Sequence, residues 1–188
     1  MQRIFYGLLM ALLDFDITFG AGGIHIVGLI PDFVGYILIR LGLDAMVPYS
    51  KRFARARPWV TGMVIYTAAL WVSDLVGLSA MLGTAITLPL ELLSITVSLK
   101  ITYEIAKGVA DMESAAGIPL NAESLRLFWI WMAFASFGTI LLFQIFPELS
   151  LASMLIGLIS NIAFLFSFHK AKNLFEEHQS RIPVRKDP

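Results

Sequence analysis

The stretch Asp14–Asp44 reads DFDITFGAGGIHIVGLIPDFVGYILIRLGLD and decides how the fold is interpreted. Its second half is an apolar run in which four polar residues recur at every fourth position: Asp32, Tyr36, Arg40 and Asp44. At helical pitch these residues form one polar stripe on an otherwise apolar helix. Because such a stripe is costly against lipid, we expect it to face protein or trapped water.

The composition of the whole chain indicates that its solvent is lipid. The 188 residues are 57% hydrophobic and only 15% charged, whereas ordinary globular domains carry about 25% charged residues. The mean hydropathy is +0.76. The chain has no cysteine, which excludes disulfides, thiolate metal sites and cysteine nucleophiles. Its formal net charge of zero gives no indication of a nucleic-acid partner.

The sequence predicts an all-α, polytopic membrane protein with six transmembrane helices, because each span needs about 20 mostly apolar residues. The expected spans cover approximately residues 4–20, 31–47, 59–78, 87–107, 122–146 and 149–169. They form one transmembrane domain over 1–170, followed by a polar cytoplasmic tail over 171–188. We interpret the N-terminal apolar run as a retained helix, since Asp14 and Asp16 interrupt the place where a signal peptide would be cleaved.

The placement of Lys and Arg predicts the orientation. The links 21–30, 79–86 and 147–148 contain no Lys or Arg. The expected loop at 48–58 contains four of them: Lys51, Arg52, Arg55 and Arg57. Since basic loops stay on the cytoplasmic side, both termini are expected to be cytoplasmic, and the links without basic residues are expected to lie outside.

Acidic residues are the main candidates for a binding site. Five fall in the outer half of the expected bundle: Asp14, Asp16, Asp32, Asp74 and Glu91. Asp32 and Glu91 closely follow prolines, so they are expected in first helical turns, where a carboxylate complements the helix dipole. Asp14 and Asp74 have no such explanation. We hypothesise a buried Asp14–Arg40 ion pair beside a hydrated pocket; the alternative is that these acids only hold helices together.

Small and hydroxyl residues form further stripes on two expected helices. Thr87, Glu91, Ser94, Ser98 and Thr102 share one face of the fourth helix, and Ser153, Gly157, Ser160 and Asn161 share one face of the sixth. Such residues usually mark close helix packing. The alternative is that they line the same pocket as the acids.

Neither a metal centre nor an enzyme is predicted. His25, His169 and His178 lack zinc-ligand spacing. The outer carboxylates are of the type that binds a hard cation, so this alternative stays open. The run Glu176–Arg181 has the E-E-x-x-x-R spacing of intramembrane glutamic proteases, but the further helices of that family do not follow it. No other catalytic or phosphate-binding motif occurs, so we expect no catalysis and no cofactor.

The segment PDFVGYILIRLGL at 31–43 resembles one found in small bacterial integral membrane proteins without a known activity. The resemblance implies a multi-pass protein of the bacterial inner membrane. Two functions stay open. In the first, an outer pocket formed by the acids, Tyr36 and Arg40 binds or moves a cation, proton or small polar solute. In the second, the chain is a non-transporting scaffold or regulatory subunit, in which Lys51, Arg52, Arg55, Arg57 and the tail contact anionic lipid or a cytoplasmic partner. A homo-oligomer is also possible.

Overall fold

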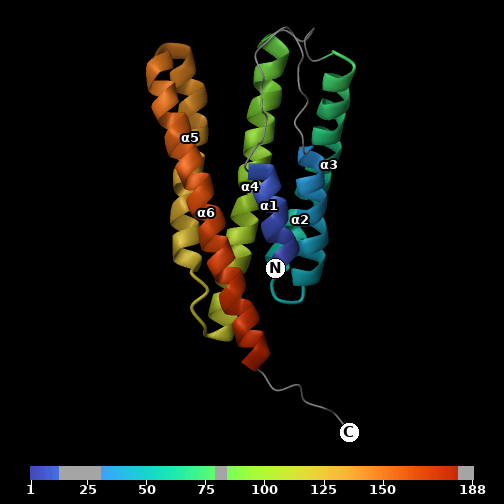
Figure 1. Ribbon diagram of the computed structural model, residues 1–188, viewed down its shortest axis with the longest axis vertical. Helices are drawn as coiled ribbons and strands as arrows, with labels where there is room; N and C mark the ends of the chain where they lie inside the picture. Colours follow the sequence, from blue (N-terminus) through green and yellow to red (C-terminus); the bar gives the residue numbers. More distant parts are fainter. Residues whose placement is uncertain (13–30, 79–83, 182–188) are drawn as a thin grey trace.

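The computed structural model describes residues 1–12, 31–78 and 84–181, which form helices and turns and no strand (Figure 1). The all-α prediction is therefore confirmed for the described part of the chain. The helices are α1 (Gln2–Leu12), α2 (Asp32–Met46), α3 (Lys51–Leu75), α4 (Thr84–Ala116), α5 (Ala122–Ile145) and α6 (Pro147–Arg181).

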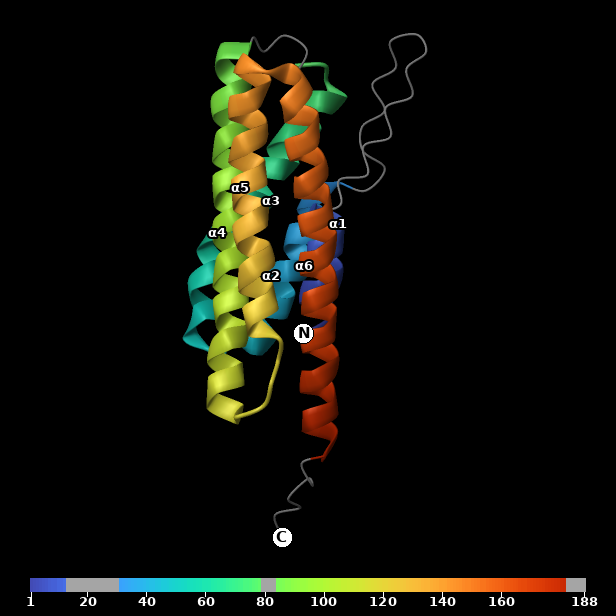
Figure 2. The ribbon, with the colours of Figure 1, turned by 90° about the vertical axis from the view of Figure 1, so that its left-hand side faces the viewer.

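Consecutive helices run in alternating directions and pack side by side, and α1 also contacts α6 (Figures 1 and 2). The links at 47–50 and 117–121 lie at the same end of the bundle as the end of α6 (Figure 1). We call this end the basic end, because α3 starts there with four basic residues in its first two turns. The turn between α5 and α6 lies at the opposite end (Figure 1).

Three helices extend well beyond their expected spans; one of them, α6, was expected to end near 169 and continues to Arg181. The segment expected as a basic loop at 48–58 is helical from Lys51 onward. Ser50 explains this start, because its Oγ accepts a hydrogen bond from the Arg52 backbone N–H at 3.1 Å and so caps the helix. Pro58 lies within α3 without ending it. In addition, α4 continues nine residues past its expected end at 107, to Ala116.

Among the described residues, three helices are long and apolar enough to cross a membrane: Ile86–Ala116, Ala122–Phe143 and Pro147–Ser180. Their large apolar side chains face outward; Phe134 is 74% exposed and Phe166 is 72% exposed. This pattern supports a membrane protein, since lipid is the environment that favours such a surface. As described, α1 and α2 have 11 and 15 residues, fewer than the ~20 that a span needs, so six spans stay a prediction.

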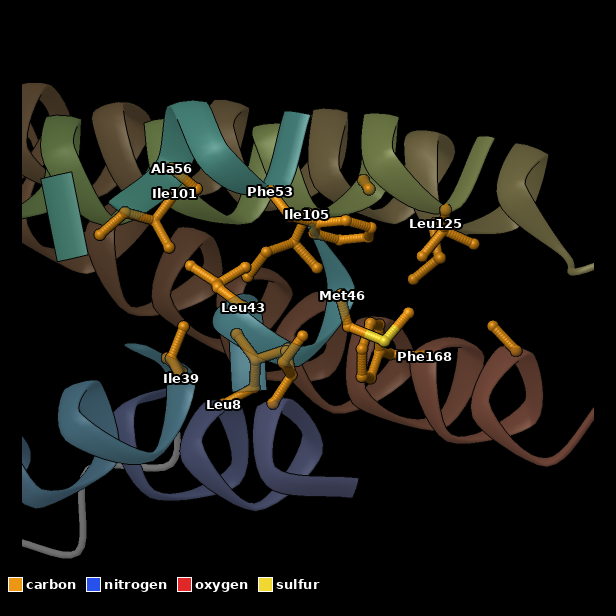
Figure 3. Close-up of a cluster of buried hydrophobic side chains, with 14 of the residues drawn as sticks. Leu8, Ile39, Leu43, Met46, Phe53, Ala56, Ile101, Ile105, Leu125 and Phe168 are labelled. Carbon is orange, nitrogen blue, oxygen red and sulfur yellow. The ribbon is translucent and has the colours of Figure 1, made fainter. Parts of the chain in front are cut away.

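The interior is an apolar cluster to which all six helices contribute (Figure 3). Leu8 of α1, Leu43 of α2 and Phe53 of α3 belong to this cluster, and all are at most 1% exposed. The labelled residues Ile101, Ile105, Leu125 and Phe168 extend the cluster across α4, α5 and α6 (Figure 3). Tyr36, expected at the binding site, belongs to this core and is only 5% exposed.

Glycine allows α1 and α2 to approach at backbone distance. A Cβ built on Gly7 would lie 2.5 Å from the Gly35 carbonyl oxygen and 2.7 Å from the Ile39 backbone nitrogen. A Cβ built on Gly42 would likewise lie 2.8 Å from the Ile4 backbone nitrogen. Because the obstructing atoms are backbone, they cannot rotate away. This seam follows the small-residue packing typical of membrane helices.

We predict that Gly7→Ala destabilises the protein by about 1–3 kcal/mol, because the new methyl group overpacks the α1–α2 seam. The control is Gly62→Ala on α3, where an added Cβ meets nothing within 4 Å and helix propensity favours alanine by up to about 1 kcal/mol. Unfolding of the two variants in detergent, followed by circular dichroism, measures the difference. Equal stability of the two variants would contradict the close α1–α2 packing.

Candidate functional site

A cavity of about 440 Å³ lies between α4, α5 and α6, with Leu12 of α1 at its edge. We call it the Glu91 groove. Its polar lining consists of Glu91 from α4, Ser136 and Thr139 from α5, and Asn161 from α6. The apolar lining comes from Leu12, Ile95, Ala135, Ile140, Met154, Gly157 and Leu158. The three helices that bound it are the three candidate spans.

Close packing of α5 on α6 sets one wall of the groove. The Ser153 hydroxyl donates to the Ala135 carbonyl oxygen at 3.0 Å across the two helices. A Cβ on Gly138 would lie 2.9 Å from the Ser153 Oγ, so a larger residue would displace the Ser153 hydroxyl. Small residues permit this approach, which leaves Ser136 and Asn161 on the sides of the pair that line the groove.

The position of α4 is fixed from both sides. Next to Glu91, the Leu90 carbonyl oxygen accepts a hydrogen bond from the Tyr66 hydroxyl of α3 at 2.8 Å. Nearer the basic end, Trp129 of α5 donates its indole N–H to the Leu99 carbonyl oxygen at 2.9 Å. Aromatic side chains therefore fill the space between α4 and α5 at the level of Leu99. The groove lies about two helical turns closer to the start of α4, beside Glu91.

Glu91 is not in the first turn of its helix, contrary to the sequence-based expectation. α4 starts at Thr84 and has no acidic residue in its first turn. The helix-dipole explanation does not apply to Glu91, because that effect falls off within one turn. For Asp32 the expectation is confirmed, since it is the first residue of α2.

The two other predicted acids that the structure describes, Asp32 and Asp74, do not line the Glu91 groove. Asp14 and Asp16 lie outside the described residues. Asp32 and Asp74 belong to neighbouring ends of α2 and α3, where the Phe33 and Trp71 rings meet edge to face with centroids 5.9 Å apart. Across residues 1–12, 31–78 and 84–181, no three acidic or histidine side chains are placed to hold a metal ion together.

Arg40 bonds to α2 and α3 in the described structure. Its Nη1 pairs with Asp44 one turn on, and its Nε donates to the Thr61 Oγ1 at 3.3 Å. Asp44 in turn accepts from the Arg57 Nη2 at 2.5 Å. The hypothesised pair with Asp14 stays untested, but Arg40 already has an acidic partner in Asp44. At this position the polar stripe bonds to α3 while Arg40 and Asp44 stay partly exposed, at 34% and 43% of their side chains.

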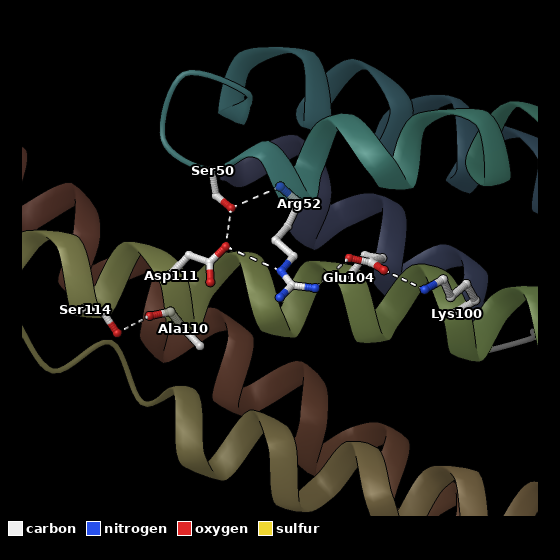
Figure 4. Close-up of polar contacts among 7 residues, drawn as sticks. All are labelled: Ser50, Arg52, Lys100, Glu104, Ala110, Asp111 and Ser114. Carbon is white, nitrogen blue, oxygen red and sulfur yellow. Dashed lines mark hydrogen bonds and ion pairs between the residues drawn. The ribbon is translucent and has the colours of Figure 1, made fainter.

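A second polar network joins α3 to α4 at the basic end (Figure 4). The Ser50 hydroxyl donates to the Asp111 Oδ2 at 2.7 Å, and the Arg52 Nε lies 3.6 Å from the same oxygen. Arg52 also reaches Glu104 at 3.7 Å; this carboxylate is only 5% exposed and pairs with Lys100 at 2.6 Å. Of the four basic residues expected to meet lipid or a partner, Arg52 and Arg57 are thus engaged within the chain, whereas Lys51 and Arg55 are exposed.

Sequence reasoning missed the contribution of α5 to the groove. Ser136 and Thr139 are three residues apart in a helix of otherwise apolar character, which was the available signal. The stripe on the sixth helix serves both expected roles, close helix packing and lining of a pocket. Gly157 and Asn161 line the groove, while Ser153 bonds to α5 and Ser160 bonds within its own helix.

Removing the hydroxyl of Ser50 is predicted to lower stability by about 1–2 kcal/mol, the usual cost of losing a helix cap. Ser50→Ala loses both the cap of α3 and the hydrogen bond to Asp111. Ser114→Ala is the matched control, because its hydroxyl is exposed and bonds only to its own helix, at Ala110 (Figure 4). Thermal unfolding in detergent should separate the two variants; an unchanged midpoint for Ser50→Ala would show that the network does not hold α3 to α4.

Comparisons with protein-family models, with curated proteins and with solved structures found no match to this chain. The functional assignment therefore rests on the side chains themselves. Among these, Glu91 combines an ionisable group, a cavity and a position within a candidate span.

Proposed function

We propose that this chain is a non-enzymatic integral membrane protein that binds and passes a cation, a proton or a small polar solute through the Glu91 groove. The observation that carries the proposal is the Glu91 carboxylate, which lines a cavity of about 440 Å³ between the three candidate spans. A cavity of this size fits a small ligand.

The energetics of the membrane argue for a role of Glu91 beyond packing. Acidic residues within membrane spans are costly to expose to lipid, and such residues normally face a cavity and mark an ion or substrate path. Within the described residues no basic side chain pairs with Glu91. The hydrogen-bonding groups across the groove are neutral, from Ser136, Thr139 and Asn161. A site with one carboxylate and three neutral polar groups suits a ligand that carries a single positive charge or a proton.

The proposed topology has six spans with both ends cytoplasmic, in the inner membrane of a bacterium. The alternating helix directions support it, because the basic end holds the links at 47–50 and 117–121 together with the end of α6 (Figure 1). The positive-inside tendency then assigns this end to the cytoplasm. In that orientation Glu91, near the start of α4, lies in the outer half of the membrane.

The scaffold function is the weaker candidate, because the structure uses part of its proposed surface elsewhere. Arg52 and Arg57 form ion pairs within the chain. Lys51 and Arg55 are the two exposed basic residues that remain at the start of α3. Two cations give a smaller attraction to anionic lipid than the four expected from the sequence, at about 1 kcal/mol each.

Glu91→Gln tests the proposal with nearly unchanged shape. We expect proton and monovalent-cation flux into proteoliposomes to fall to the level of empty vesicles, because the substitution removes the negative charge from the groove. Glu148→Gln is the control: Glu148 is an exposed acid in the first turn of α6, where it complements the helix dipole. Flux through Glu91→Gln equal to that of the wild type would contradict a pathway through the groove.

A further inference from the structure

A second cavity, of about 270 Å³, lies between α4 and α5 toward the basic end. Lys107 of α4 and Arg126 of α5 line it together, and we call it the Lys107–Arg126 cavity. The other lining residues are Tyr103, Ala106, Ala110, Ala122, Glu123 and Trp129. It is separate from the Glu91 groove and shares no lining residue with it.

The two cations are available for a ligand. No ion pair to Lys107 or Arg126 occurs in the described parts of the chain, although Glu123 lines the same cavity. Glu123 is exposed and contributes one negative charge against two positive ones. Lys100, the next basic residue on α4, is already paired with Glu104. The cavity therefore keeps an excess positive charge.

The surroundings hold together the two helices that carry the cations, although the Arg126 side chain itself is exposed. The Glu113 carboxylate accepts hydrogen bonds from the backbone N–H groups of Leu120 and Ala122, at 2.7 and 3.1 Å, and so fixes the start of α5 one turn before Arg126. On α4, the Lys107 Nζ lies 5.8 Å from the centre of the Tyr103 ring. That ring meets Trp129 with centroids 4.9 Å apart, which joins the two walls.

We propose that the Lys107–Arg126 cavity binds a phosphate-bearing anion, with an anionic phospholipid headgroup as the membrane source and free inorganic phosphate as the soluble one. Arg126 supplies a planar guanidinium that can donate two hydrogen bonds to phosphate oxygens, and Lys107 adds a second charge from the facing helix. The rings of Tyr103 and Trp129 are of the type that concentrates at the membrane surface. Basic pockets between membrane helices on the cytoplasmic side are suited to such headgroups.

The test compares two double variants of the full chain that each remove two positive charges. Lys107→Gln/Arg126→Gln empties the cavity of cations, whereas Lys51→Gln/Arg55→Gln removes exposed cations from the same end of the bundle. Native mass spectrometry measures retention of phosphatidylglycerol against phosphatidylcholine, and circular dichroism confirms that both variants remain helical. We expect the first variant to bind phosphatidylglycerol about thirtyfold more weakly than the wild type, and the second to stay close to it.

Addition of inorganic phosphate distinguishes the two sources. If inorganic phosphate does not displace bound phosphatidylglycerol, the ligand is the headgroup. If inorganic phosphate binds saturably to the wild type without lipid, and Lys107→Gln/Arg126→Gln loses this binding, the ligand is the free anion. Equal weakening in both double variants would show a diffuse attraction to the whole basic end and would overturn the proposal. Unchanged binding in Lys107→Gln/Arg126→Gln would overturn it as well.

Discussion

The structure depends on a hydrocarbon environment, in place of water, around the outward surface of α4, α5 and α6. Large apolar side chains cover the outside of these helices, with Phe134 at 74% and Phe166 at 72% exposure. In water such a surface would be strongly unfavourable, whereas in lipid it costs nothing to expose. The same environment makes each polar group expensive unless it has a partner or a cavity. The positions of the polar side chains are therefore informative in this chain.

Those polar side chains divide into two groups. At the basic end, arginine and acid side chains bond to one another between α2, α3 and α4, and this bonding gives them a structural explanation. Away from the basic end, Glu91 lines a cavity with Ser136 and Asn161. It has no charged partner among the described residues. Structural bonding explains the first group and leaves the second unexplained. This difference assigns the proposed function to the groove.

Hydropathy and turn residues predicted the helical class and several bounds closely. The fifth span was expected at 122–146 and is observed at Ala122–Ile145, because Asn121 and Pro147 flank a predominantly apolar run. The start of α3 was missed, since Pro58 and four basic residues look like a loop until the cap on Ser50 is seen. The groove could not be predicted, because periodicity gives the face of a helix but not which neighbours it meets. As a result, Asp32 lies at the start of α2 and Asp74 near the adjacent end of α3, whereas Glu91 lines the groove with residues of α5 and α6.

Two positions on α5 test the membrane environment and the groove together. Phe134 faces outward and Ser136, two residues later, lines the groove. Because the chain contains no cysteine, Phe134→Cys and Ser136→Cys each carry a single thiol for a membrane-impermeant maleimide added to intact cells. We expect Ser136→Cys to be labelled, and Phe134→Cys to be labelled only after the membrane is dissolved. Labelling of Phe134→Cys in the intact membrane, or protection of Ser136→Cys there, would contradict a water-accessible groove between lipid-facing helices.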